Sequence, residues 1–81
     1  MIKRVLLFAS AKESVGQDSV DLELAVDATV ADLRKQLITD YPVLNDLVAR
    51  SHIAVDQQFA LDDTSLTDAR EVALIPPVSG G

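Results

Sequence analysis

The residues that could take part in chemistry gather at the end of the sequence, where Gly80 and Gly81 follow Pro76 and Pro77. Glycines could enter a narrow channel in another protein, because they permit close backbone approach and unusual φ values. The carboxylate of Gly81 could attack the α-phosphate of ATP on a partner enzyme, and sulfide could then displace AMP to leave a thiocarboxylate. This chemistry needs no cysteine, and the chain has none. The alternative interpretation of the two glycines is a flexible tail without a function.

The rest of the chain offers little catalytic machinery of its own. His52 is the only imidazole, and no serine stands in a nucleophile elbow, so we expect a structural role for His52. The acidic pair Asp62 and Asp63 and the acidic residues between positions 18 and 23 lack the spacing and the turning glycine of a calcium loop. A glycine-rich phosphate loop is also missing. We therefore expect no bound metal or cofactor, and no enzymatic activity of the chain alone.

Length and charge narrow the class of protein and of partner. The 81 residues suffice for one small domain, and a hydrophobic content of 48% predicts a packed core. The formal net charge of −6 disfavours nucleic acid and favours a basic protein surface as partner. No stretch approaches a membrane span, and the apolar residues 1–9 are too few for a secretion signal. We expect a cytoplasmic protein that does not associate with membranes.

Hydrophobic patterning predicts the strands of a sheet. The apolar run 2–9 and the alternating segment 19–26 predict two strands, with Val20, Leu22, Leu24 and Val26 on one face and a loop over 10–18 between the strands. Further short strands are predicted at 52–55, 58–61 and 71–75. The last strand is expected beside the first, and Leu66 is expected to anchor the polar loop 62–65 to the core.

One main helix is predicted between the second and third strands. Thr29 is a good N-cap, and Asp32 stands where a capping box needs a carboxylate. The helical spacing ends at Tyr41, because a residue before proline resists the α region. A short second helical turn is expected around residues 44–48. The pattern predicts an α+β fold, in which the helix covers one face of a mixed sheet of about five strands. This domain spans residues 1–75, and an extended tail spans residues 76–81.

Several segments resemble the small subunits of molybdopterin synthase. They are the opening residues 2–9 (IKRVLLFA), Ala11-Lys12-Glu13 with Val15-Gly16, and the closing segments 66–68 (LTD) and 71–81 (EVALIPPVSGG). The resemblance covers the whole chain, and its closing segment is the most specific part. It implies a ubiquitin-like β-grasp fold and a sulfur carrier. It also implies an ATP-dependent, E1-like activating enzyme and the large synthase subunit as partners. In a heterotetramer with that subunit, two thiocarboxylated carriers would convert precursor Z (cyclic pyranopterin monophosphate) to the dithiolene of molybdopterin.

The resemblance also implies roles for individual residues. By position, Gly81 would carry the adenylate and then the thiocarboxylate, and Gly80 would keep the tip slim. Both partners would hold the carrier through an apolar patch on the exposed sheet face. Core packing is the alternative, since alternation alone cannot assign a strand residue to a face. The candidates for the patch are Phe8, Phe59 and Ile75, with Pro76, Pro77, Val78 and Ser79 guiding the tail.

Two turns depart from the pattern of this family. Val55-Asp56 stands where many members have Val-Asn, and Asp also suits a turn. Ala69-Arg70 stands where a glycine is common, so we expect a different turn type there.

Two further classes of function stay open at this point. One is a sulfur carrier of another pathway, such as thiamine or tungsten cofactor synthesis, or a modifier conjugated to lysines. The other is a non-covalent ubiquitin-like binding module.

Overall fold

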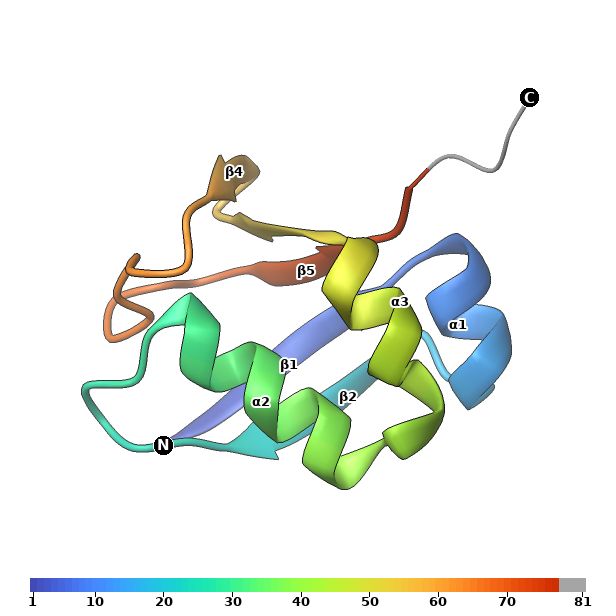
Figure 1. The fold of residues 1–81 in the computed structure, drawn as a ribbon. Coiled ribbons are helices and arrows are strands. Elements are labelled where there is room, and N and C mark those ends of the chain that lie inside the picture. The colour runs from blue at the N-terminus through green and yellow to red at the C-terminus, as the bar shows by residue number, and fades with distance from the viewer. Residues whose placement is uncertain (78–81) are drawn as a thin grey trace.

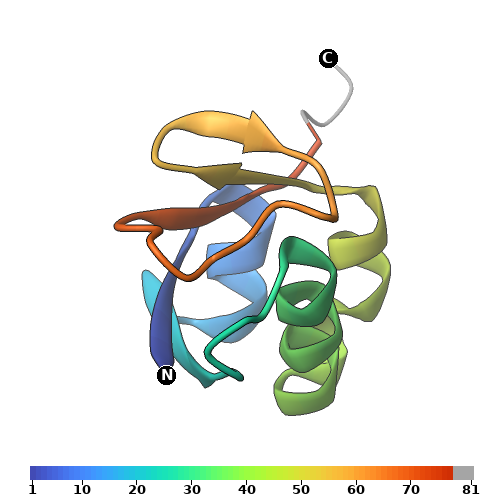
Figure 2. The same ribbon diagram turned by 90° about the vertical axis from the view of Figure 1, so that its left-hand side faces the viewer.

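A five-stranded mixed sheet forms one layer of the molecule, and the helices lie against one of its two faces (Figure 1, Figure 2). The structure is a computed structural model that describes residues 1–77. The strands are β1 (Ile2–Leu7), β2 (Ser19–Glu23), β3 (His52–Val55), β4 (Gln58–Ala60) and β5 (Val72–Ile75). Their order across the sheet is β2-β1-β5-β3-β4.

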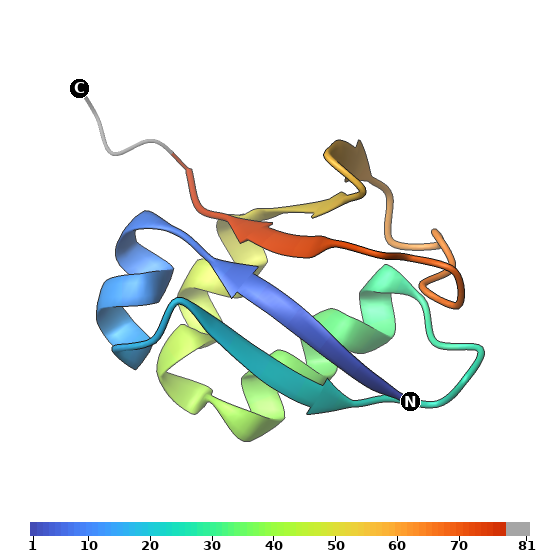
Figure 3. The same ribbon diagram turned by 180° about the vertical axis from the view of Figure 1, so that it is seen from behind.

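The last strand lies beside the first, as predicted, and this pairing decides where the chain leaves the domain. β5 pairs parallel with β1 and antiparallel with β3. The register sets Leu7 of β1 opposite Leu74 of β5. Because parallel strands end at the same edge, both strands point to one side of the molecule (Figure 3). Phe8, which follows β1, and Pro76, which follows β5, therefore come from neighbouring strand ends.

The helices are α1 (Ala9–Val15), α2 (Val30–Asp40) and α3 (Asn45–Arg50), with a 3₁₀ turn at Pro42–Leu44 before α3. The prediction of a loop over residues 10–18 is wrong, because α1 occupies most of it. Only Ala11 of this helix is buried, and Phe8 at the N-cap makes no side-chain capping bond. The sequence therefore offers only Ala11 and Val15 as core positions, and no N-cap side chain, to signal the helix. Gly16 ends it with φ of 79°, a left-handed conformation that suits glycine.

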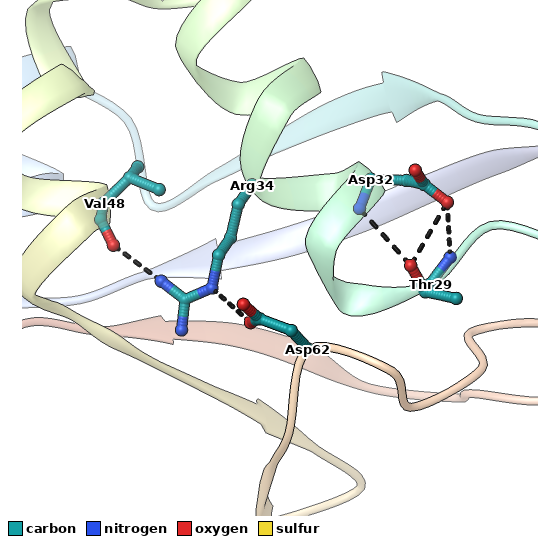
Figure 4. A network of polar contacts seen from close by, with 5 residues as sticks. All are labelled: Thr29, Asp32, Arg34, Val48 and Asp62. Carbon is teal, nitrogen blue, oxygen red and sulfur yellow. Dashed lines mark hydrogen bonds and ion pairs between the residues drawn. The ribbon is translucent and has the colours of Figure 1, made fainter.

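The main helix α2 begins with the predicted capping box (Figure 4). Thr29 Oγ1 accepts the backbone N–H of Asp32 at 3.5 Å, and the Asp32 carboxylate accepts the N–H of Thr29 at 2.9 Å. The bonds that the Asp32 carboxylate accepts from the backbone N–H and the hydroxyl of Thr29 lower the pKa of Asp32, since they favour the charged carboxylate. The cap fixes where α2 starts, and with it the row of side chains that α2 turns toward the sheet.

Arg34 ties α2 to two other segments (Figure 4). Its Nη1 donates to the carbonyl oxygen of Val48 in α3 at 2.6 Å, and its Nε donates to Asp62 in the loop after β4 at 3.0 Å. The guanidinium of Arg34 thus links α2 and α3 to the loop that follows β4, the strand at the edge of the sheet.

The core lies between the sheet and the helices, and it is almost wholly aliphatic. Leu66 is 0% exposed, which confirms that it anchors the loop between β4 and β5. The inward position predicted for Val26 is wrong, because β2 ends at Glu23 and leaves Val26 71% exposed. The largest side chains of the core are Val5, Leu7, Leu22, Val30, Leu33, Leu37, Leu44, Val48, Ile53, Leu66, Val72 and Leu74.

The turn between β3 and β4 fastens this hairpin to the start of β5. Asp56 and Gln57 have φ of 50° and 70°, as a type I′ hairpin turn requires. The Asp56 carboxylate accepts the backbone N–H groups of Arg70 at 2.9 Å and Glu71 at 2.8 Å. The bond from Glu71 and then that from Arg70 lower the pKa of Asp56. Neither Ala69 nor Arg70 has a positive φ, so this turn does not require a glycine at either position.

Within residues 1–77, none of the helices has the length and apolar character needed to cross a membrane.

Candidate functional site

The sheet face opposite the helices carries a row of small and apolar side chains. The register aligns Leu6 of β1 with Ala73 of β5, Ala73 with Ala54 of β3, and Ala54 with Phe59 of β4. Their strand neighbours Val72 and Leu74 are buried in the core, so this row faces the other way. We call this side, seen in Figure 3, the outer face.

The outer face ends in a strip of larger side chains at the edge where β1 and β5 finish. Phe8 is 47% exposed and Phe59 is 70% exposed, so the core-packing alternative is wrong for both. Ile75 is half-buried and lies opposite His52 in the β3–β5 register. His52 stacks on Phe59, with ring centroids 4.7 Å apart. The structure therefore joins these four residues into one band, the outer strip, composed of Phe8, Ile75, His52 and Phe59.

His52 is the member of the outer strip that sequence reasoning missed. A structural role was expected, but the side chain is exposed and lies flat on Phe59, with 15° between the rings. The alternation in β3 could have indicated that His52 lies on the outer face, because Ile53 is buried while His52 lies on the opposite face with Ala54. A stacked pair of rings presents a flat apolar surface to a partner.

The outer strip continues into a hollow where the chain leaves the sheet. The hollow has a volume of about 430 Å³ and is lined by residues of α1 and by the end of the last strand. Pro76 is buried and Pro77 is exposed, so the last side chain anchored to the body in residues 1–77 is that of Pro76. The lining residues are Phe8, Ala9, Ser10, Glu13, Ile75, Pro76 and Pro77.

The structure thus brings Phe8, Ile75, Pro76 and Pro77 together around the hollow, while Phe59 joins them through His52. The other site residues expected from the sequence are Val78, Ser79, Gly80 and Gly81. These four lie outside the described residues.

The outer strip itself carries no carboxylate or amine. Charged pairs of the described residues lie elsewhere, such as Arg4 with Asp21 at 3.2 Å on the outer face of β1 and β2. Lys12 of α1 bonds Asp18 at 2.7 Å, and this hydrogen bond raises the pKa of Lys12. Apolar side chains bordered by charges are typical of protein docking surfaces, whose core is depleted of charge.

A second hollow, of about 460 Å³, lies beyond Phe59 along the sheet edge, next to the turn of the β3–β4 hairpin. Residues 1–77 hold no group of three or more His, Asp or Glu side chains placed to bind a metal ion. In the same residues every buried side-chain polar atom has a hydrogen-bond partner. What the described residues offer is an exposed apolar surface beside the point where the chain leaves the sheet.

Comparisons with known proteins agree on one relationship. The sequence profile of the ThiS family matches residues 5–81. The chain is 42% identical over 84 residues to the molybdopterin synthase sulfur carrier subunit of Escherichia coli, and all of both chains is covered. It is 37% identical over 81 residues to the protein of that name from Dictyostelium discoideum, covering 96% of this chain and 94% of the relative.

Among solved structures, SAMP1, the small archaeal modifier protein 1 of Haloferax volcanii, has a TM-score of 0.87 to this chain. The two are 28% identical, and all of both chains is covered. Together with the sheet order, this likeness confirms the predicted α+β, ubiquitin-like β-grasp fold.

Proposed function

Because the chain belongs to the ThiS family, among the sulfur carrier subunits of molybdopterin synthase, we propose that it carries sulfur for the synthesis of the molybdenum cofactor. The observation that carries this proposal is the full-length identity of 42% to a relative of that name. The position of the outer strip supports it, since an apolar surface beside the origin of the tail suits a partner that takes the tail.

The working group in this proposal is the terminal carboxylate of Gly81. One carboxylate oxygen attacks the α-phosphorus of ATP on an E1-like activating enzyme, and pyrophosphate leaves. Sulfide, or a persulfide with a reductant, then attacks the acyl carbon of the adenylate and AMP leaves, so that a thiocarboxylate remains. ATP is a substrate of the partner, and the carrier itself binds no cofactor. Gly80 keeps the tip narrow, because glycine permits close backbone approach in the partner's channel.

The second partner in this proposal is the large synthase subunit, with which the carrier forms a heterotetramer. The thiocarboxylate enters its active site and gives sulfur to precursor Z, and two such transfers build the dithiolene of molybdopterin. The carrier is then the sulfur-donating subunit and has no activity alone. Both partners are cytoplasmic in this proposal, as is the carrier.

In this proposal the chain has two parts with different roles. Residues 1–75 provide the folded body, and residues 76–81 provide the tail that reaches into the partner. The exposed ring of Pro77 supports a tail that leaves the body there, while the buried ring of Pro76 holds its base. Val78 and Ser79 span the distance between this base and Gly80 in the proposal.

Two variants of the tail test the proposal in a reconstituted synthesis with the activating enzyme, ATP, a sulfur source, the large subunit and precursor Z. We expect deletion of Gly81 to abolish dithiolene formation and Gly80→Leu to impair it strongly. Neither variant should change the melting temperature, since neither alters a residue of the core. Dithiolene formation by the Gly81 deletion at the wild-type rate would sink the carrier proposal.

A second candidate function is a protein modifier, and the likeness to SAMP1 favours it. In that case the Gly81 carboxylate would form an amide with a lysine of another protein. Trypsin would cut after Arg70 and leave residues 71–81 attached to the modified lysine. Mass spectrometry of cell extracts for lysines that carry this remnant separates the candidates. A carrier alone predicts none, whereas a modifier predicts many that depend on Gly81.

A further inference from the structure

The chain carries four primary amines that an activated carboxylate could acylate, and all four lie within residues 1–77. They are the amino group of Met1 and the side-chain amines of the three lysines, Lys3, Lys12 and Lys35. An amine is a nucleophile only after it loses a proton, and contacts that hold its protonated form or bury it oppose this. The four amines differ in such contacts.

Two of these amines belong to half-buried residues and are bonded to the domain. The Met1 amine donates to the carbonyl oxygen of Leu24 at 2.6 Å and lies 3.0 Å from the Glu23 carboxylate. Lys3 Nζ donates to the carbonyl oxygen of Ala69 at 2.7 Å. Acylation of either amine would break these bonds and place the acyl group against the body of the domain.

The amine of Lys12 is exposed but paired. Its Nζ lies 2.7 Å from a carboxylate oxygen of Asp18, and the hydrogen bond with Asp18 raises the pKa of Lys12. Less of the unprotonated amine is therefore present at neutral pH. Because the pair is exposed to solvent, it lowers the reactivity of Lys12 without abolishing it.

Lys35 is the lysine without such a contact. It is exposed on α2, and its side-chain amine makes no hydrogen bond or ion pair within residues 1–77. The carboxylate three residues before it, that of Asp32, accepts two bonds from Thr29 in the capping box. The amine of Lys35 is therefore open to solvent and to an acyl donor.

The position of Lys35 leaves the outer strip uncovered. Leu33 and Leu37 of α2 are both 0% exposed in the core, so the exposed Lys35 lies on the side of the helix away from the sheet (Figure 1). The outer strip lies on the other face of the sheet, and the exposed Pro77 follows the end of β5. A second copy attached at Lys35 need cover neither of them.

We propose that copies of this chain are joined through an amide between Gly81 of one copy and Lys35 of the next. The nitrogen of Lys35 attacks the acyl carbon of the Gly81 adenylate and forms a C–N bond. The bond between that carbon and the AMP oxygen breaks, AMP leaves, and the nitrogen gives a proton to water. This inference deepens the modifier candidate by naming the acceptor, and it rests on the proposed activation of Gly81 by ATP.

A consequence of this geometry is that chains of more than two copies can form. The acceptor copy keeps its own Gly81, and its outer strip stays free for the activating enzyme. It can therefore be activated in turn and attached to a further copy.

The joining reaction is tested with the full chain, the activating enzyme and ATP, without a sulfur source. We expect a covalent dimer with the mass of two chains less one water, and residues 71–81 attached to Lys35 after trypsin. Lys35→Arg keeps the charge but removes the nucleophile, so it should lower the dimer yield about tenfold or more. Lys12→Arg is the matched control, because Lys12 is also an exposed lysine on a helix, and should change the yield less than about twofold. Equal yields of the two variants, or a remnant mainly on another amine, would overturn the inference.

A small acyl donor tests the reactivity of Lys35 without any partner. The folded chain is treated with a limiting amount of the N-hydroxysuccinimide ester of acetic acid, and acetylation of each lysine is followed by mass spectrometry. We expect Lys35 to react first, Asp18→Asn to raise the rate at Lys12, and the three rates to converge in urea. Equal rates at the three lysines of the folded wild-type chain would overturn the inference.

Pyrophosphate release separates this inference from the proposed function. If the wild-type chain and the enzyme release no pyrophosphate from ATP, activation of Gly81 fails, and both proposals fail with it. If pyrophosphate is released and sulfur is donated when a source is added, but no covalent dimer forms without one, only the joining of copies is overturned.

Discussion

The same strands build both faces of the sheet, but one face packs in the core and the other faces solvent. Toward the helices, β1 and β5 present Val5, Leu7, Val72 and Leu74, all buried. Toward solvent, the neighbouring positions lie on the outer face, where Phe8 is exposed and Ile75 is half-buried at the edge where β1 and β5 end. Because side chains alternate along a strand, one short segment can hold the fold together and dock a partner. Adjacent substitutions should therefore have unlike effects.

The largest expected effect on stability comes from the pair Leu74 and Ile75. Leu74 is 0% exposed, so Leu74→Ala should lower the free energy of unfolding by about 2–5 kcal/mol through lost burial and a cavity. Ile75→Ala should cost less stability, since Ile75 is half-buried, but should weaken binding of the large subunit. Denaturant unfolding and a binding titration of both variants check this. Equal losses of stability would break the contrast between the two faces.

The next effect concerns the exposed aromatic ring of the outer strip. Phe59→Ala should weaken binding of the large subunit about 10- to 100-fold, as truncation of an aromatic anchor does. It should leave the free energy of unfolding nearly unchanged, because the ring is 70% exposed. Val43→Ala is the matched control, since Val43 is 65% exposed in the helical layer. A binding loss as large for Val43→Ala would argue against the outer strip as the docking surface.

A smaller effect is expected at the start of α2, away from both the outer face and the tail. Thr29→Ala removes the N-cap oxygen and should cost about 1 kcal/mol of stability without affecting binding. Thr39→Ala on the same helix is the control, because the Thr39 hydroxyl only donates to the carbonyl of Lys35. That change should alter stability by a few tenths of a kcal/mol. A similar loss in both variants would contradict a specific capping role.

The smallest effect is a pH dependence that comes from Asp56. The hydrogen bonds from Glu71 and Arg70 hold its pKa below the ordinary value, so the folded state releases this proton more readily than the unfolded state. The contribution of Asp56 to the free energy of unfolding is therefore complete above about pH 4, the ordinary pKa of an aspartate. It is lost as the pH falls through the lower pKa of the folded state. Asp56→Asn keeps an acceptor oxygen but lacks this dependence.

The measurement is the unfolding midpoint of the wild-type chain and of Asp56→Asn between pH 7 and pH 2. The advantage of the wild-type chain should shrink on acidification. Asp27→Asn serves as control, because Asp27 makes no hydrogen bond within residues 1–77. A constant advantage across the range would show that the bonds to Asp56 do not favour its charged form.

Features that depend on neighbours in the sequence could be predicted from it. The capping box of Thr29 and Asp32 involves residues three apart, and the strand at 52–55 has its predicted bounds. The place of β5 beside β1 followed from the expected order of elements. Helix α1 could not be found in this way, because only Ala11 and Val15 of its residues pack against the core, and two positions are too few for a clear helical pattern.

Features that depend on how distant segments pair in the fold could not be predicted from the sequence. The alternation of apolar and polar residues continues to Val26, but pairing with β1 ends at Glu23. The sequence pattern is therefore longer than the strand. The faces of Phe8 and Phe59 stayed undecided, because a shift of one residue exchanges the two faces of a strand. The hollow joins Glu13 to Pro77 across most of the chain, and only the parallel pairing of β1 and β5 brings their ends together.

The most direct test of the carrier function is the intact mass of the protein after incubation with the activating enzyme, ATP and a sulfur source. We predict a gain equal to the exchange of one oxygen for one sulfur, and no gain when Gly81 is deleted. An unchanged mass with an enzyme that is active on another carrier would contradict a thiocarboxylate at Gly81.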